Sequence, residues 1–421
     1  MVARALLDEM TFGAVSRRER PVASHIPYSR HVDDHILKTR DELLLTVFKL
    51  DGYSFETSDI SEVNARLLGR NDIVRTLANS RFALVAHIIR REVEPRIAST
   101  FDNAFCRELD ARYNAALSKR RMFVNDLYVT IVRRPLQGHA GTFDVLLGKL
   151  LGRKDEAGES LARQVALNEL RDVATAVRES LASYGARQLG VVDRDGAWFS
   201  EPLEFLVQLV NGGLWRPMPL PRMELGQALA MKRLFFGRNA VEIRGAAPGD
   251  TRFAAMISIR EYPAQTGPGS FDNLLRCPHE FIATQSFAIV DRPEAARAID
   301  RVARQVDMSD EAGSVISEHL DSARDELLAS EAIYGEHHMT VMCLGQDLGE
   351  VAAAVTAVGA ALTDRSVIWV REDLNCEPAF WSQLPGNFAY IARKAIISSK
   401  NFAGFTSLHN YPSGRPNGNH W

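Results

Sequence analysis

The chain has 421 residues, 46% of them hydrophobic and 24% charged, which is typical of a soluble globular protein with two or three domains. Its net charge of −3 excludes a generally basic protein of the nucleic-acid-binding class, and its four scattered cysteines exclude a disulfide framework and a zinc module. Since no secretory signal and no apolar stretch of bilayer-spanning length are found, we expect a cytoplasmic chain that reaches a membrane only through partners.

The N-terminal pattern changes character after residue 40. Residues 1–40 are polar and contain prolines that discourage a helix, so we expect an irregular arm. Residues 43–57 predict a β-hairpin, because Asp51-Gly52 supplies the positive φ that a two-residue turn needs. A helix should then begin at Ser58 or Asp59, either of which can cap it, and end near residue 79.

Strands and helices alternate in the next part of the chain. The expected elements are a buried strand over 82–89, a helix over 102–120 and a strand over 126–132. This order favours a sheet with helices packed on one face. The stretch 138–159 is rich in Gly, Lys and Arg and predicts a mobile loop.

Two long amphipathic helices are expected over 161–184 and 294–330, the second with room for a break near 307–313. Each would carry one apolar stripe, because apolar residues recur at steps of mostly three or four. Such stripes predict either packing within the domain or a helical hairpin that reaches a neighbouring subunit. The stripe residues are Leu161, Val165, Leu170, Val173, Val177, Leu181 and Tyr184 in the first helix and Ile299, Val302, Val306, Ile316, Leu320 and Leu327 in the second.

The remaining pattern completes an α+β fold, with mixed sheets, packed helices and the two long amphipathic helices. Further strands are expected over 240–244, 253–261 and 281–290, followed by a strand–helix–strand unit over 339–344, 348–362 and 366–370. The predicted organisation is an arm (1–40), a first α+β subdomain (41–150), a central subdomain (151–335), a strand–helix–strand subdomain (336–411) and a linker (412–421).

Motifs for catalysis and cofactor binding are missing from the sequence. A phosphate-binding loop needs Gly-x-x-x-x-Gly-Lys followed by Ser or Thr, because its amides and lysine hold the phosphates and its hydroxyl holds magnesium. The one Gly-Lys pair, Gly148-Lys149, is followed by Leu150 and lacks the first glycine. We therefore expect no catalytic residue, cofactor or metal in this chain, and no RecA-like motor domain.

Two histidine pairs come nearest to a metal site. His31 and His35 are four residues apart with aspartates between them, but the flanking sequence is not helical and the metalloprotease glutamate is missing. His337 and His338 precede a strand and would point to opposite faces of a sheet. Structural roles are the preferred interpretation.

The C-terminal part carries a distinctive set of short segments. They are Phe380-Trp381-Ser382-Gln383-Leu384-Pro385-Gly386-Asn387, Asn401-Phe402-Ala403-Gly404-Phe405, Ser407-Leu408-His409-Asn410 and Gly418-Asn419-His420-Trp421. Together they resemble the CagE/TrbE/VirB family, the large ATPases of type IV secretion and conjugation machines. Segments 24–28, 31–34, 51–57, 278–287 and 335–341 look similar to earlier blocks of the family, so the likeness covers nearly the whole chain in order.

The resemblance implies an N-terminal assembly and docking part of such an ATPase, which helps to energise transfer of DNA or protein across the bacterial envelope. Family members continue into a motor domain with Walker motifs, so ATP and Mg²⁺ are expected only there. The implied partners are inner-membrane secretion subunits, further copies of the chain in dimers or hexamers, and the motor half, with no direct nucleic acid. This places the chain peripherally on the inner membrane. The alternative is a truncated or split-gene ATPase that is active only when paired with a separate motor half.

The same segments supply candidate residues for an interface with the motor. Pro385-Gly386 signals a tight turn after a short helix, and Asn387 can bond backbone groups. A second interpretation is that Phe380, Trp381 and Leu384 form an apolar lip that seats the motor. The predicted motor-facing residues are Phe380, Trp381, Leu384, Pro385, Gly386, Asn387, His409, Asn410 and Trp421.

Overall fold

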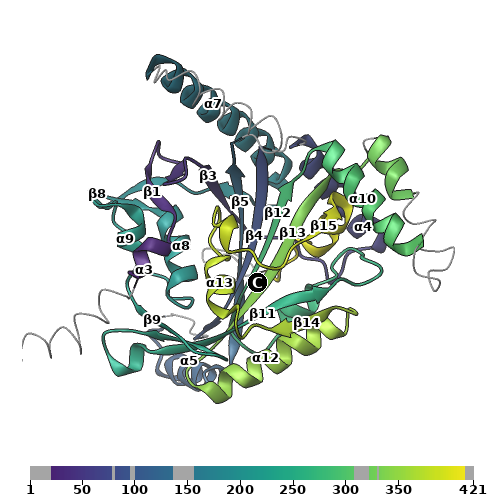
Figure 1. Cartoon of the computed structure of the whole chain (residues 1–421). Helices are drawn as coiled ribbons and strands as arrows, with labels where there is room; N and C mark the ends of the chain where they lie inside the picture. The colour runs from purple at the N-terminus through teal and green to yellow at the C-terminus, as the bar shows by residue number, and fades with distance from the viewer. Residues whose placement is uncertain are drawn as a thin grey trace, which may run out of the picture.

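The computed structural model describes residues 20–77, 81–94, 100–135, 156–307, 322–329 and 331–412. It confirms the α+β class, since a large antiparallel sheet runs through the molecule and helices pack around it (Figure 1). Within these ranges, the helices are too short or too polar to cross a membrane.

Thirteen strands of the described chain join in one sheet. The order along its main path is β1-β2-β3-β5-β4-β12-β13-β11-β10-β9, while β6, β14 and β15 pair with β3, β11 and β13. The predicted subdomain divisions therefore do not mark separate sheets, because β4 pairs with β12 and β12 with β13.

The strands are β1 Tyr28–His31, β2 Leu37–Thr39, β3 Leu44–Leu50, β4 Phe82–Val93, β5 Met122–Arg133, β6 Arg187–Gln188, β9 Arg233–Phe236, β10 Val241–Arg244, β11 Arg252–Glu261, β12 Phe281–Ile289, β13 Tyr334–Gly345, β14 Ile368–Arg371 and β15 Ala395–Ser398, with β7 Val191–Arg194 and β8 Ala197–Ser200 forming a separate hairpin.

The sheet has a hydrophobic core on each face. The apolar face, as we call it, is covered by α4, α7, α12 and α14, and the opposite motif face by α8, α9 and α13. The expectation of helices on one face is wrong, because the central strands carry buried residues on both sides and each side needs a cover. The helices are α3 Val22–His25, α4 Ile60–Thr76, α5 Ala104–Leu117, α7 Glu156–Ser180, α8 Glu201–Val210, α9 Leu225–Leu229, α10 Arg292–Asp307, α12 Leu348–Thr363, α13 Cys376–Trp381 and α14 Ser399–Phe405, with short 3-10 turns η2 Ala182–Tyr184, η3 Pro248–Asp250, η4 Asp272–Arg276 and η5 Phe388–Tyr390.

The N-terminal predictions need two corrections. The arm is not irregular throughout, because α3, β1 and β2 form within it. The predicted hairpin is wrong in its second half: Gly52 has the expected positive φ of 87°, but Tyr53 makes only a single bridge, to His409. The reason is that β5 occupies one edge of β3, while β2 and β6 share the other, with β6 at the end near Gly52, so no edge is left for a hairpin partner.

The first long helix forms as α7, and the described part of the second contains α10, which ends at Asp307. On α7, Leu170 and Val177 are buried, whereas Leu161 is 68% exposed, because the N-terminal half of the helix projects from the body (Figure 1). Ile299 of α10 packs with Leu327 in a small cluster. The predicted break, and the predicted loop as far as residue 155, lie outside the described residues.

Candidate functional site

α13 and the turn after it hold the first group of predicted interface residues. Phe380, Trp381 and Leu384 are 1%, 1% and 2% exposed and belong to the core of the motif face. The rings of Phe380 and Trp381 meet edge to face, with their centroids 5.0 Å apart. Because their apolar surface is already covered by this chain, these three side chains do not form an exposed lip.

Pro385, Gly386 and Asn387 form the tight turn that their sequence predicts. Gly386 has φ 93°, which favours glycine. The side-chain amide of Asn387 donates to the carbonyl of His25 at 3.0 Å, and the hydroxyl of Tyr28 donates to the carbonyl of Pro385 at 3.0 Å. The turn therefore fastens the N-terminal segment to the motif face.

His25 is a further link between the N-terminal segment and α13. Its ring stacks on Trp381 at a centroid distance of 4.8 Å, and its Nδ1 lies 2.8 Å from the hydroxyl oxygen of Tyr390. Desolvation lowers the pKa of His25, and the Glu377 carboxylate, 3.9 Å from Nε2, opposes this shift. The neutral ring is favoured near pH 7 and stacks on the indole of Trp381.

A row of buried polar side chains crosses the sheet beneath α8 and α13, and no sequence motif signals it. The row consists of cross-strand neighbours on β5, β4, β12, β13 and β11, namely Tyr128, His87, Thr284, Thr340 and Ser258. Nε2 of His87 donates to the carbonyl of Gln383 at 2.8 Å. Burial lowers the pKa of His87 to about 4, so this ring is neutral at pH 7.

Several atoms in this buried layer have no hydrogen-bond partner. They are Oγ1 of Thr284, Oγ of Ser258 and Nδ1 of His87 within the row, Oγ1 of Thr130 beside it, and Oε1 of Gln383 above it. Buried polar atoms are normally paired, so such a group of them in one layer is unusual. The motif face therefore contains several unpaired polar atoms in the buried layer that reaches Gln383, just before the turn.

His337 and His338 face opposite sides of β13, as strand alternation predicts. On the apolar face, Nδ1 of His337 lies 2.8 Å from the hydroxyl of Tyr262, and Nε2 lies 3.2 Å from Oε1 of Gln285. Burial lowers the pKa of His337 to about 3. On the motif face, Nε2 of His338 lies 3.0 Å from the hydroxyl of Ser382. Neutral groups hold both rings, which supports a structural role.

A groove of about 390 Å³ opens beside the turn. Gly386, Asn387 and Phe388 line it and are only half-buried, and Ala389 on its rim is exposed. Glu336 of β13 and Lys394 also line the groove, and they form an ion pair with each other at 2.5 Å. This groove is the part of the turn that another protein can reach.

His409 and Asn410 are positioned by a different part of the molecule. His409 is 2% exposed, its Nδ1 donates to Oδ2 of Asp272 at 2.7 Å, and its ring stacks on Phe55 at 4.7 Å. Leu408, next to it, packs against the core of the apolar face. The structure therefore does not bring His409 and the turn after α13 together, because the two segments lie against opposite faces.

Asn410 bonds to two distant parts of the backbone. Its side-chain amide donates to the carbonyls of Asp51 and Asn125, each at 3.0 Å. A Cβ at Gly52 would lie 2.5 Å from Cβ of Asn410, so glycine is required there for close approach as well as for its φ. Trp421, the last predicted interface residue, lies outside the described residues.

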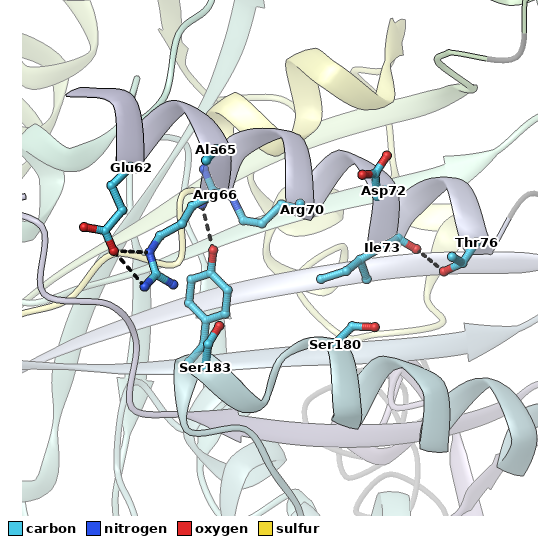
Figure 2. Close-up of a pocket in the computed structure, with 11 residues that line it drawn as sticks. Glu62, Ala65, Arg66, Arg70, Asp72, Ile73, Thr76, Ser180 and Ser183 are labelled. Atoms are coloured by element: carbon cyan, nitrogen blue, oxygen red, sulfur yellow. Dashed lines mark hydrogen bonds and ion pairs between the residues drawn. The ribbon is translucent and has the colours of Figure 1, made fainter. Parts of the chain in front are cut away.

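A second cleft, of about 450 Å³, lies between α4 and the end of α7 (Figure 2). Arg66 forms an ion pair with Glu62 at 3.1 Å, while Nη1 of Arg70 donates to the hydroxyl of Tyr184 at 3.0 Å. Arg70 is 4% exposed, and its Nε donates to the carbonyl of Ala403 on α14 at 3.3 Å. This guanidinium ties three elements of the apolar face together, and no sequence motif signalled it.

A metal centre finds no support in the part of the chain that the structure describes. There, His, Cys, Asp and Glu side chains do not gather in threes at distances suited to a metal ion. Nε2 of His31 lies 2.9 Å from the hydroxyl of Ser200, and Nδ1 of His35 lies 3.0 Å from the carbonyl of Leu189. The two rings are thus engaged by separate partners.

Comparison with known proteins identifies two adjoining family regions. Residues 35–140 match the N-terminal domain of the type IV secretion system ATPase VirB4/TrbE, which contains β3, β4, β5 and the helices between them. Residues 187–393 match the CagE, TrbE, VirB family, described as a component of the type IV transporter system. The second region contains α13 and the turn after it.

Relatives resemble the chain over nearly all of its length. The type IV secretion system protein virB4 of Bartonella henselae is 34% identical over 409 residues, which cover 97% of this chain and 51% of that protein. The type IV secretion system protein PtlC of Bordetella pertussis is 32% identical over 98% of this chain and 50% of its own length. Protein virB4 of Agrobacterium tumefaciens is 31% identical over 97% of this chain and 51% of its own length.

The chain thus spans about half the length of the curated relatives that it matches. Both matched regions lie in order on the one continuous sheet described above. The resemblance first indicated by the C-terminal segments is confirmed, and the chain belongs to the CagE/TrbE/VirB family of type IV transporter components.

Proposed function

We propose that this chain is the N-terminal, non-motor part of a type IV secretion ATPase and serves as its assembly and docking module. The match over residues 35–140 to the N-terminal domain of such ATPases supports this proposal, as does the half-length coverage of the relatives. The sequence has no phosphate-binding loop, so ATP and Mg²⁺ would bind in the motor half. The module would help to energise transfer of DNA or protein across the envelope.

One observation carries the proposal: the segment that ends the described chain is hydrogen-bonded to η4, to the residue that follows β3 and to β5. His409 is held by Asp272, and Asn410 by the backbone of Asp51 and Asn125. These anchors come from three separate stretches of sequence. A motor that follows the predicted linker 412–421 would be joined through it to this held segment, so its movements could be transmitted to whatever the sheet contacts.

The predicted motor-facing residues then divide into two roles. Phe380, Trp381 and Leu384 act from inside, because they are buried and hold the turn in place. Gly386 and Asn387 would make the contact itself, since they line the accessible groove. The partners in this proposal are the motor half, inner-membrane secretion subunits and further copies of the chain, which would hold the module on the cytoplasmic side of the inner membrane.

Co-purification with inner-membrane secretion subunits, with and without the motor half, tests this role. We expect Ala389→Arg, on the exposed rim of the groove, to lower recovery of a partner about tenfold or more, because a desolvated charge at an interface is costly. Ala352→Arg, on an exposed position of α12, is the matched control. Equal recovery with both variants would remove the groove from the interface, and no recovery with the unmodified chain would contradict the docking role.

The alternative function is a split ATPase whose activity appears only when a separate motor half is present. The half-length match to the relatives is the observation that favours it. Mixing this chain with the cognate motor half and measuring ATP turnover distinguishes the two. ATP turnover that rises well above that of the motor half alone supports the split ATPase. Unchanged turnover, while this chain still binds the motor half, supports the docking module.

A further inference from the structure

Residues 211–239, which connect α8 to β10, form a locally basic surface in an otherwise acidic chain. This stretch has five basic residues and one acidic residue, a net charge of +4, whereas the whole chain carries −3. The basic residues are Arg216, Arg222, Lys232, Arg233 and Arg238. We call this stretch the 211–239 surface; α9 and β9 within it lie along the same side of the molecule, at the left in Figure 1.

The charge of this surface is not compensated. Arg216, Arg222, Arg233 and Arg238 are exposed, and no ion pair to any of them is found among the described residues. The one carboxylate of the stretch, Glu224, is already paired with Arg40 at 2.5 Å. Four guanidinium groups are therefore available to an anionic partner.

Large apolar side chains are exposed among these arginines. Trp215 is 52% exposed, Met223 58%, Met231 46%, Phe235 43% and Leu220 40%. Single exposed apolar residues are normal, but five of them within one basic stretch mark an interaction surface.

The backbone that displays them is fixed in advance. Prolines at 217, 219 and 221 restrict the loop, and the side chain of Met218 is buried in the core. The amide of Ser200 donates to the carbonyl of Met218, and the amide of Leu220 donates to the carbonyl of Trp198, each at 2.8 Å. Little conformational entropy is lost when such a preorganised loop binds a partner.

We propose that the 211–239 surface docks directly on an anionic lipid surface. Tryptophan and aliphatic side chains would enter the headgroup region while the arginines neutralise lipid phosphates. A single-stranded nucleic acid fits less well, because its sites present aromatic rings along a groove, whereas three of the five apolar residues here are Leu or Met. This contact goes beyond the proposed function, in which the membrane is reached through protein partners.

Vesicle flotation with the purified full chain tests the proposal. The chain should float with vesicles of phosphatidylcholine that contain roughly one-third phosphatidylglycerol, and not with pure phosphatidylcholine. High salt should release it, because the attraction is screened within a Debye length.

Charge variants locate the contact. The triple variant Arg216→Gln, Arg222→Gln, Arg233→Gln should lower partitioning on the order of 100-fold, or about fivefold per arginine. Its matched control removes three exposed basic side chains of the α5 region, as Arg112→Gln, Lys119→Gln, Arg120→Gln, and should change partitioning only a few-fold. An equal loss in both would show attraction to net charge alone and overturn the assignment.

Apolar variants test insertion, with the fold checked by circular dichroism. Trp215→Ser with Met223→Ser should lower partitioning about tenfold or more, whereas Phe105→Ser with Leu109→Ser on α5, a pair at least as exposed, should not. The proposal fails if anionic vesicles do not bind, or if a single-stranded oligonucleotide binds the same surface and displaces the vesicles. Either failure leaves the subunit recovery experiment unaffected, because that experiment measures protein partners and can be done on detergent-solubilised subunits without vesicles.

Discussion

The two faces of the sheet bury their contents in different ways. On the apolar face, Phe287 stacks on Phe402 at a centroid distance of 4.8 Å, and the buried His337 has partners for both ring nitrogens. On the motif face, a polar row lies under α13, and Thr284 and Ser258 have unpartnered hydroxyl oxygens. Both faces have a packed hydrophobic core, and the motif face also positions a turn through bonds from side chains to backbone carbonyls.

This contrast leads us to expect that the two faces respond differently to mutation. A face that is packed with rings resists any change of arrangement, because interiors tolerate neither voids nor extra volume. A polar layer contacts the segment that covers it through a few hydrogen bonds, such as the one that His87 donates to the carbonyl of Gln383. We therefore expect mutations on the two faces to change the free energy of unfolding by different amounts. The following experiments test that difference, from the largest expected effect to the smallest.

Phe287→Ala on the apolar face should have the largest effect. Its side chain is fully buried, so truncation removes apolar burial and leaves a cavity, at a cost of about 3–5 kcal/mol in the free energy of unfolding. Urea denaturation monitored by circular dichroism measures this cost. A loss below about 1 kcal/mol would mean that this face does not carry the stability.

Gly52→Ala should loosen the segment that carries His409 and Asn410. The backbone φ of 87° and the 2.5 Å approach to Cβ of Asn410 leave no room for a methyl group, so we expect a cost of roughly 1–3 kcal/mol. Gly69→Ala, in the open interior of α4, is the matched control and should instead stabilise the chain by about 0.5–1 kcal/mol. Equal effects at the two glycines would contradict the close packing at Asn410.

Acidification should weaken both faces through their buried histidines. Burial lowers the pKa of His87 to about 4 and that of His337 to about 3, from an unfolded value near 6.5. Between these values the unfolded chain binds more protons than the folded chain, so the stability present above pH 6.5 falls as the pH drops. The expected loss at pH 5 is about 2 kcal/mol per histidine.

His87→Gln isolates the contribution of the motif face to this pH dependence. A glutamine amide can still donate to the carbonyl of Gln383 but does not titrate. The free energies of unfolding measured at pH 7.5 and at pH 5 should therefore differ by about 2 kcal/mol less in the variant than in the unmodified chain. An unchanged difference would show that His87 is not buried as a neutral ring.

Thr284→Val should have the smallest effect of the series. The hydroxyl oxygen of Thr284 is buried without a partner, so its replacement by a methyl group of similar size should be neutral or stabilising by up to about 1 kcal/mol. Thr340→Val is the control, because the hydroxyl of Thr340 donates to the carbonyl of Ile257 at 3.1 Å and its loss should destabilise. Equal losses at both threonines would mean that the polar row is fully satisfied.

Local patterns predicted many elements of this fold but not how they meet. The apolar runs of β4 and β12 were recognisable, yet their pairing joins strands that are far apart in the sequence. α8 was not predicted, because nine of its residues are buried and a helix that is covered all round shows no apolar stripe. By contrast, α5 was predicted although none of its residues is fully buried.

The candidate site shows the same limit. The Pro-Gly turn and the role of Asn387 follow from local chemistry, and both are found in the structure. Burial of Phe380 and Trp381 could not be predicted, because aromatic residues beside a turn occur in cores and at interfaces alike. The bond between His409 and Asp272 joins residues that share no motif, so only the fold reveals it.

The central claim is that this chain organises a type IV secretion ATPase but does not supply its nucleotide chemistry. Calorimetric titration of the purified chain with ATP and Mg²⁺, together with an assay of phosphate release, tests it most directly. We predict no binding heat and no turnover above that of a mock preparation, because the sequence has no Gly-x-x-x-x-Gly-Lys-Ser/Thr loop to hold a triphosphate. Magnesium-dependent binding in the micromolar range, or phosphate release by the chain alone, would contradict the account.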